Sequence, residues 1–134
     1  MYVVTKRIDF CYGHRLLNYD GVCKHPHGHN AMVEIDVCAE ELDHRDMVVD
    51  FSDIKRLVKR WIDQELDHKM ILRHDDPLVA ALRAMGEPVY VLDSNPTAER
   101  IAKLIFDKAR ELGLDVAAVR VWETPTSRTE YSET

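Results

Sequence analysis

The residues with the most chemical content in this chain occupy positions 23–29, with the sequence CKHPHGH. His27 and His29 are two residues apart, so on an extended backbone both imidazoles point to the same side of a strand. His14 ends an earlier strand-like run and completes a set of three, the usual number of protein ligands at a catalytic zinc ion. Such a set leaves a position open, where the cation can polarise a bound hydroxyl. The alternative is that these are solvated loop histidines or that one hydrogen-bonds in the core, and we expect His25 to be solvated.

The thiol of Cys23, four residues before His27, is the second candidate group. A thiol near a cation has a lowered pKa and can act as a base or a nucleophile near neutral pH. It can equally be a fourth ligand that closes a structural zinc site, or a small buried side chain. Cys11 and Cys38 lie within strand-like runs, and we expect both to be inert packing residues.

Asp67–His68 and Glu123 are the remaining candidates. A carboxylate that fixes the tautomer of an imidazole makes it a directed proton carrier, although adjacent Asp and His side chains often have no such role. Glu123 follows a strand-like run and is either simply exposed or an acceptor of paired hydrogen bonds from a planar, amidine-like ring.

Composition limits the classes of function. With 134 residues, of which 46% are hydrophobic, the chain is expected to form one domain over residues 1–134. A formal net charge of -6 and the absence of a basic stripe exclude a general nucleic-acid binder. No apolar run approaches the roughly 20 residues of a membrane helix, and residues 1–6 do not resemble a secretory leader. Three cysteines suggest free thiols in a reducing compartment, so we expect a cytoplasmic protein.

The hydrophobic periodicity predicts an α+β domain in ββααββ order, a four-stranded antiparallel sheet with two long helices on one face. Strands are predicted over residues 2–10, 30–39, 117–122 and 128–131, with a loop over residues 14–28. One helix is expected to follow Ser52 as N-cap, and another to run from residues 95–97 to Gly113. A short helix over residues 76–86 and a minor strand over 89–92 come between them. A sheet covered on one side has open edges, which favours association.

These residues resemble a known family, the 6-pyruvoyltetrahydropterin and 6-carboxytetrahydropterin synthases, whose members adopt the tunnelling fold. The resemblance covers nearly the whole chain, with the blocks in order. The matching blocks are Phe10 with His14, Cys23-x-x-x-His27-Gly28-His29-Asn30, Met47-Val48-x-Asp50-Phe51, Leu66-Asp67-His68, Pro96-Thr97-x-Glu99, and Glu123-Thr124 with Tyr131.

The resemblance implies a role for each matching residue. It assigns zinc to His14, His27 and His29, catalysis to Cys23, Asp67 and His68, and substrate binding to Glu123 and Thr97. Glu123 would anchor the 2-amino and N3 positions of the pterin ring. The implied substrate is 7,8-dihydroneopterin triphosphate, and the implied assembly is a homo-oligomer, a trimer or a dimer of trimers, with active sites at subunit interfaces.

The spacing between Cys23 and His27 is similar to that of the carboxy branch, which releases acetaldehyde and triphosphate and supplies the queuosine and deazapurine pathway. The alternatives are the pyruvoyl branch, in which triphosphate is eliminated, and a pterin-binding or zinc-stabilised homologue without this activity. Two departures concern the site: Tyr12 can narrow it, and residues 73–94 form a longer segment than in compact members. Asp46 replaces a common glycine and is expected to alter only a turn.

Overall fold

A long β-hairpin forms the centre of the molecule. The computed structural model describes residues 1–133, and in it β1 (Tyr2–His14) pairs antiparallel with β2 (His27–Ala39) along their whole length. The register brings His14 opposite His27. Both strands extend further than the sequence predicted, so the expected loop over 14–28 is shorter and contains one turn of 3₁₀ helix, η1 (Val22–Lys24).

Two long helices were predicted, and both are present. The first consists of α1 (Phe51–Ile54), a π-helical segment η2 (Lys55–Lys59) and α2 (Arg60–Glu65), which follow one another without a break. Its N-cap is Asp50 rather than Ser52, because the Asp50 carboxylate accepts hydrogen bonds from the Ser52 backbone and hydroxyl. The second helix, α4 (Ala98–Glu111), has Thr97 as N-cap.

The sheet has six strands and is mixed, so the prediction of four antiparallel strands was wrong. Its order is β4-β3-β1-β2-β5-β6, with β5 (Val116–Thr124) and β6 (Ser127–Ser132) antiparallel to their neighbours. The unpredicted strand β3 (Lys69–Arg73) and the predicted minor strand β4 (Val89–Leu92) are parallel to β1 and to each other. The short helix α3 (Pro77–Ala84) connects them.

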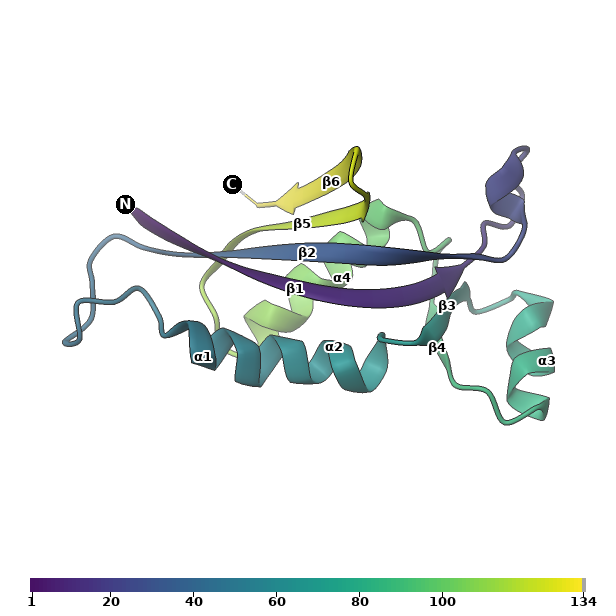
Figure 1. The fold of residues 1–134 in the computed structure, drawn as a ribbon, viewed down its shortest axis with the longest axis horizontal. Coiled ribbons are helices and arrows are strands. Elements are labelled where there is room, and N and C mark those ends of the chain that lie inside the picture. The colour runs from purple at the N-terminus through teal and green to yellow at the C-terminus, as the bar shows by residue number, and fades with distance from the viewer. Residues whose placement is uncertain (134) are drawn as a thin grey trace.

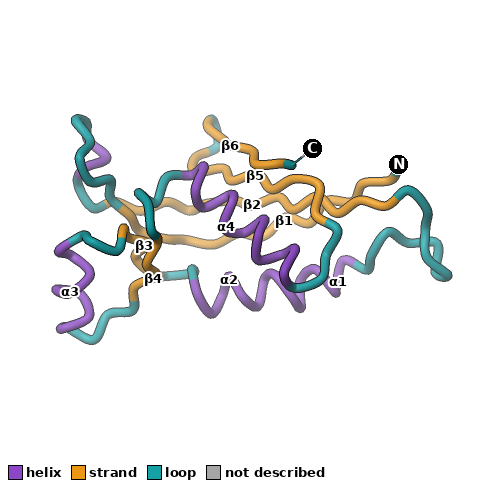
Figure 2. Tube along the Cα trace, turned by 180° about the vertical axis from the view of Figure 1, so that it is seen from behind, coloured by secondary structure: helices purple, strands orange, loops and turns teal. Residues whose placement is uncertain are grey.

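One face of the sheet carries the hydrophobic core. Alternate residues of β1 and β2 point into it, and both long helices contribute fully buried side chains to the same cluster. In Figures 1 and 2 these helices lie along one side of the hairpin, whereas the N-terminus and α3 lie at opposite ends of the molecule. The core residues include Ile8, Phe10, Val33, Ile35, Ile54, Val58, Ile62, Ile101, Ile105 and Phe106.

Candidate metal centre and active site

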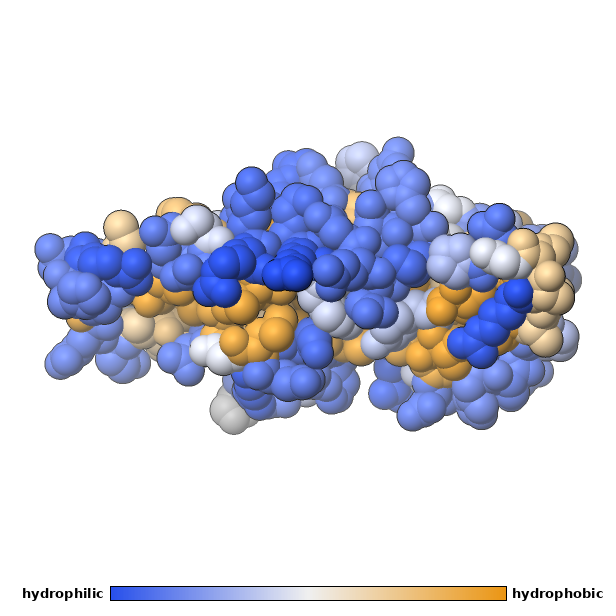
Figure 3. Space-filling model, turned by 90° about the horizontal axis from the view of Figure 1, so that it is seen from below, coloured by the Kyte–Doolittle hydropathy of each residue, from blue (hydrophilic) through white to orange (hydrophobic). Residues whose placement is uncertain are grey.

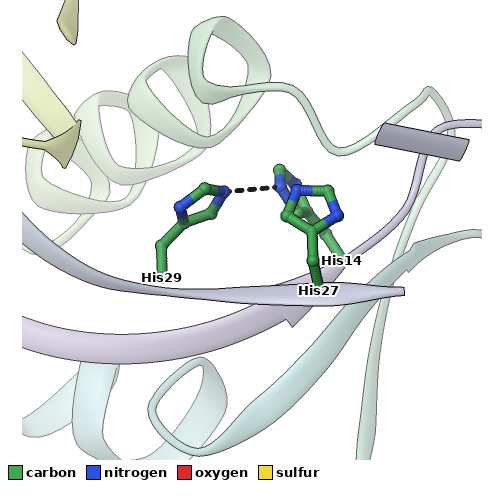
Figure 4. A group of neighbouring side chains, drawn as sticks. All are labelled: His14, His27 and His29. Atoms are coloured by element: carbon green, nitrogen blue, oxygen red, sulfur yellow. Dashed lines mark hydrogen bonds between the residues drawn. The ribbon is translucent and has the colours of Figure 1, made fainter. Parts of the chain in front are cut away.

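Three histidines meet where the hairpin opens. His14 ends β1, and His27 and His29 begin β2, so the antiparallel register makes the three residues neighbours. All three are on the face that carries the core, and their ligand atoms lie within 4.8 Å of one another. Figure 4 shows the imidazoles rising from the two strands toward a common point. The structure therefore brings together the three residues that the sequence singled out as metal ligands, and their binding of a metal stays a prediction.

The ring nitrogens of two of these histidines are oriented by the backbone. His14 Nδ1 donates to the Pro96 carbonyl at 2.6 Å, and His27 Nδ1 donates to the His25 carbonyl at 2.8 Å. In a neutral ring held in this way, the proton is on Nδ1 and Nε2 is available as a ligand. Burial lowers the pKa of His14 by more than the Pro96 hydrogen bond raises it, which favours the neutral form that binds a metal.

The donor set fits a divalent zinc-type ion. His29 Nε2 and His14 Nε2 are only 3.1 Å apart, and Figure 4 marks this contact. Within residues 1–133, neither Cys23 nor a carboxylate belongs to this group of ligand atoms. Three neutral imidazoles with an open side form a catalytic rather than a closed structural arrangement. This conformation gives no support to Cys23 as a fourth ligand.

Glu123 stands beside the histidines on the same face. Val119 and Val121 of β5 are buried in the core, so the alternation of the strand brings Glu123 to that side as well. Its Oε1 lies 3.9 Å from His14 Nε2 and accepts a hydrogen bond from the Tyr12 hydroxyl at 3.2 Å. Burial and the neighbouring Glu123 raise the pKa of Tyr12, so its hydroxyl remains a donor.

Tyr12 is the polar neighbour that the sequence reasoning missed. It was expected only to narrow the site, although its position two residues before His14 already implied the same face of β1. The Tyr12 ring stands edge-on to the His14 ring, with centroids 5.1 Å apart. Tyr12 therefore connects the carboxylate of Glu123 to the histidine cluster.

Thr97 reaches this site only indirectly. Its hydroxyl accepts from the Arg100 amide at 3.2 Å and caps α4, while the preceding carbonyl, of Pro96, holds His14. In the described part of the chain, the Thr97 side chain makes no hydrogen bond to the three histidines. Its role in substrate binding stays a prediction.

Cys23 lies on η1 and is partly exposed, in the loop that joins the two histidine-bearing strands. Its carbonyl accepts a hydrogen bond from the Leu16 amide at 2.9 Å. The start of this loop is held by two more contacts: the Arg15 guanidinium pairs with the buried Asp76, and the Asn95 side chain bonds both backbone groups of Leu17. These hydrogen bonds and the ion pair fix the loop that carries the Cys23 thiol.

Asp67 and His68 form the expected pair, at a place away from the histidines. His68 Nδ1 donates to Asp67 Oδ2 at 2.8 Å. The other carboxylate oxygen accepts from the Cys11 amide at 3.0 Å, and the His68 amide donates to the Cys11 carbonyl at 2.7 Å. Burial alone would raise the pKa of Asp67, but these hydrogen bonds lower it. The Cys11 side chain alternates with core-facing Phe10 and Tyr12, so it points to the opposite face of the sheet.

Comparison with known proteins identifies the family. A family model described as 6-pyruvoyl tetrahydropterin synthase matches residues 3–134. The chain belongs to the 6-pyruvoyl tetrahydropterin synthase family. Its relatives include proteins named 6-carboxy-5,6,7,8-tetrahydropterin synthase. The one from Rickettsia conorii is 38% identical and aligns over 90% of this chain and 93% of its own. The one from Haemophilus influenzae is 30% identical over 99% and 100% of the two chains.

Solved structures of this family share the fold. An uncharacterized protein from Wolinella succinogenes superposes with a TM-score of 0.82 at 30% identity, covering 99% of this chain and 98% of its own. The Caenorhabditis elegans 6-pyruvoyl tetrahydropterin synthase superposes with a TM-score of 0.74 at 22% identity, covering 100% and 98%. The tunnelling fold expected from the sequence is therefore confirmed. In the described residues, no helix has the length and apolarity needed to cross a membrane.

Proposed function

We propose that this protein is a zinc-dependent carbon–carbon lyase that converts 7,8-dihydroneopterin triphosphate to 6-carboxy-5,6,7,8-tetrahydropterin, acetaldehyde and triphosphate. The product would enter queuosine and other deazapurine biosynthesis. The observation that carries the proposal is the meeting of His14, His27 and His29 with Glu123 on one face. The names of relatives that are 30% and 38% identical over most of the chain support the carboxy branch.

Each group has a distinct task in this reaction. The Glu123 carboxylate would accept two hydrogen bonds from the 2-amino and N3 positions of the pterin, with Tyr12 fixing one of its oxygens. This contact holds the side chain of the substrate next to the three imidazoles. A zinc ion bound there supplies Lewis-acid stabilisation of the negative charge that develops on the side-chain oxygens.

Proton transfer is assigned to Cys23 and to the Asp67–His68 pair. Cys23 would take a proton from one side of the substrate side chain, and His68, oriented by Asp67, would act on the other. Because Asp67 and His68 are on the far side of the sheet from the histidines of the same chain, we assign this pair to the site of a second copy.

This assignment requires a homo-oligomer, a trimer or a dimer of trimers, and the surface is suited to one. In the described part of the chain, residues 2–10 of β1 pair only with β2, and β6 is an outer strand, so both offer unpaired backbone groups. Several large apolar side chains are exposed near the N-terminus, and Figure 3 shows apolar patches on an otherwise hydrophilic face. These exposed residues are Tyr2, Val3, Met47 and Phe51. The three unpaired cysteines are consistent with the cytoplasm, where we place the enzyme.

Product identification by mass spectrometry tests the reaction. Zinc-loaded protein incubated with dihydroneopterin triphosphate should release acetaldehyde together with the 6-carboxy product. A diketone side chain would instead assign the chain to the pyruvoyl branch, and binding without turnover would make it a pterin-binding homologue. Cys23→Ala should keep both zinc and fold and lose turnover. Loss of zinc in this variant would contradict the proposed role of Cys23.

A further inference from the structure

A second group of metal-ligating side chains lies on the face of the sheet opposite the histidines. The thiol of Cys11, the carboxylate of Asp67 and the imidazole of His68 offer ligand atoms within 4.8 Å of one another. Cys11 was expected to be an inert packing residue. It is only partly buried, and it borders a cleft of about 840 Å³ together with the other two residues.

The backbone holds these three side chains together across a large separation in sequence. Cys11 and Asp67–His68 are joined by two hydrogen bonds, from the Cys11 amide to Asp67 Oδ1 and from the His68 amide to the Cys11 carbonyl. His68 adopts a left-handed backbone with φ of 60°, which is uncommon for residues other than glycine, although histidine takes it more often than most side chains. The surrounding structure therefore holds this uncommon backbone conformation, which places the imidazole beside the thiol.

The Lys and Arg side chains that line the cleft pair with carboxylates other than Asp67. The nearby cations already have carboxylate partners: Lys59 pairs with Asp63 at 2.6 Å, and Arg7 pairs with Asp9 at 3.1 Å. A thiolate, an imidazole and a carboxylate together are a ligand set typical of zinc and other borderline divalent ions.

We propose that Cys11, Asp67 and His68 form a second binding site for a zinc-class divalent ion, separate from the three-histidine cluster. The site itself is independent of the proposed function. One consequence does depend on that function: an ion bound here would occupy the imidazole and carboxylate needed for proton transfer. Excess zinc should then inhibit the enzyme, and the inhibition should be reversed by a mild chelator that leaves the histidine site loaded.

The stoichiometry of bound zinc tests the site on the full-length protein. After equilibrium dialysis against excess Zn²⁺, elemental analysis should find two ions per chain in the wild type. Cys11→Ala and His68→Asn should each retain one ion, and Cys38→Ala, a matched control thiol elsewhere, should retain two. Asparagine tolerates the left-handed backbone at position 68, so that variant tests the ligand without disturbing the fold.

Cobalt spectroscopy identifies the ligands directly. In a Co²⁺ titration of metal-free protein, the histidine cluster should give no thiolate-to-cobalt absorption, whereas the second equivalent should give a thiolate band. This band should be absent from Cys11→Ala and present in Cys23→Ala. A single ion per wild-type chain, or a thiolate band that survives in Cys11→Ala, would overturn the proposal. Failure of the pterin reaction, with two ions still bound, would refute only the proposed function.

Discussion

Replacement of Asp76 by alanine should destabilise the fold near the loop that carries Cys23. The Asp76 side chain is completely buried, at 0% exposure, and it has two tasks. It receives two hydrogen bonds from the guanidinium of Arg15, the residue after His14, and it caps α3 by accepting from the Leu78 amide at 2.8 Å. The variant removes both contacts at once.

The magnitude follows from these two contacts. Loss of an N-cap costs about 1 kcal/mol. Breaking a buried ion pair costs about 3–5 kcal/mol when the remaining charge stays buried. Because the Arg15 side chain is 23% exposed, its guanidinium can turn toward water, which reduces the second cost. We expect a total loss of about 3 kcal/mol for Asp76→Ala, and about 2 kcal/mol for Asp76→Asn, which keeps an acceptor for Leu78.

The effect should depend on pH with a definite sign. The Arg15 and Leu78 hydrogen bonds hold the pKa of Asp76 below its ordinary value, against the effect of burial. A carboxyl group whose pKa is lower in the folded than in the unfolded protein stabilises the fold at pH values above its unfolded pKa, which is about 3.9. This stabilisation is lost as the pH falls through the pKa of the folded state. The difference between wild type and Asp76→Ala should therefore be constant near neutrality and shrink below about pH 4.

Urea unfolding at fixed protein concentration measures the change. If the free energy of unfolding falls by about 1.5 kcal/mol per molar urea, the urea midpoint should be about 2 M lower for Asp76→Ala than for the wild type. Asp75→Ala is the matched control, because Asp75 is an exposed neighbour whose partner is the separate Arg73, and its midpoint should hardly change. A midpoint shift under about 0.5 M, or a difference that persists unchanged at low pH, would refute this reasoning.

Three further changes test the site. Tyr12→Phe should lower the free energy of unfolding by about 1 kcal/mol and raise the KM for the pterin more than it changes kcat, because Glu123 loses a hydrogen-bond donor; steady-state kinetics would show this split. His68→Gly should be about 1 kcal/mol more stable than His68→Ala in urea, because φ is 60° there, and both variants should lack turnover. Thr97→Ala should lower the free energy of unfolding by about 1 kcal/mol, because it removes the N-cap of α4, and Thr97→Asn should restore it; thermal unfolding measures both.

The features that were predicted correctly depend on local periodicity. Alternation along β1 and β2 predicted the two strands, and the two-residue spacing of His27 and His29 predicted a shared face. The end of the second long helix was also predictable, since Gly113 has φ of 102°, which favours glycine. These patterns involve neighbours in sequence, so one chain contains enough information to find them.

The features that were missed depend on distant pairing. The five residues of β3 follow the Asp67–His68 turn at once, and they show no alternation that separates them from the end of a helix. Their parallel pairing with Tyr12–His14 is made only in three dimensions. This pairing fixes Asp67 and His68 against Cys11, on the far side of the sheet from the three clustered histidines. Sequence spacing contains no signal for that separation.

The segment 73–94, which had no functional explanation from sequence, has a physical one in the structure. It supplies Asp76, which holds Arg15, and it leads directly into Asn95 and Pro96, which hold Leu17 and His14. The end of β1 and the start of α4 are thereby fixed to each other through side chains and carbonyls rather than through strand pairing. Because the orientation of a ligand imidazole depends on the group that accepts its other proton, movement of this segment would change the direction in which His14 Nε2 points. This segment is therefore part of the scaffold of the histidine cluster, and we expect substitutions within it to alter metal affinity although it contains none of the three histidines.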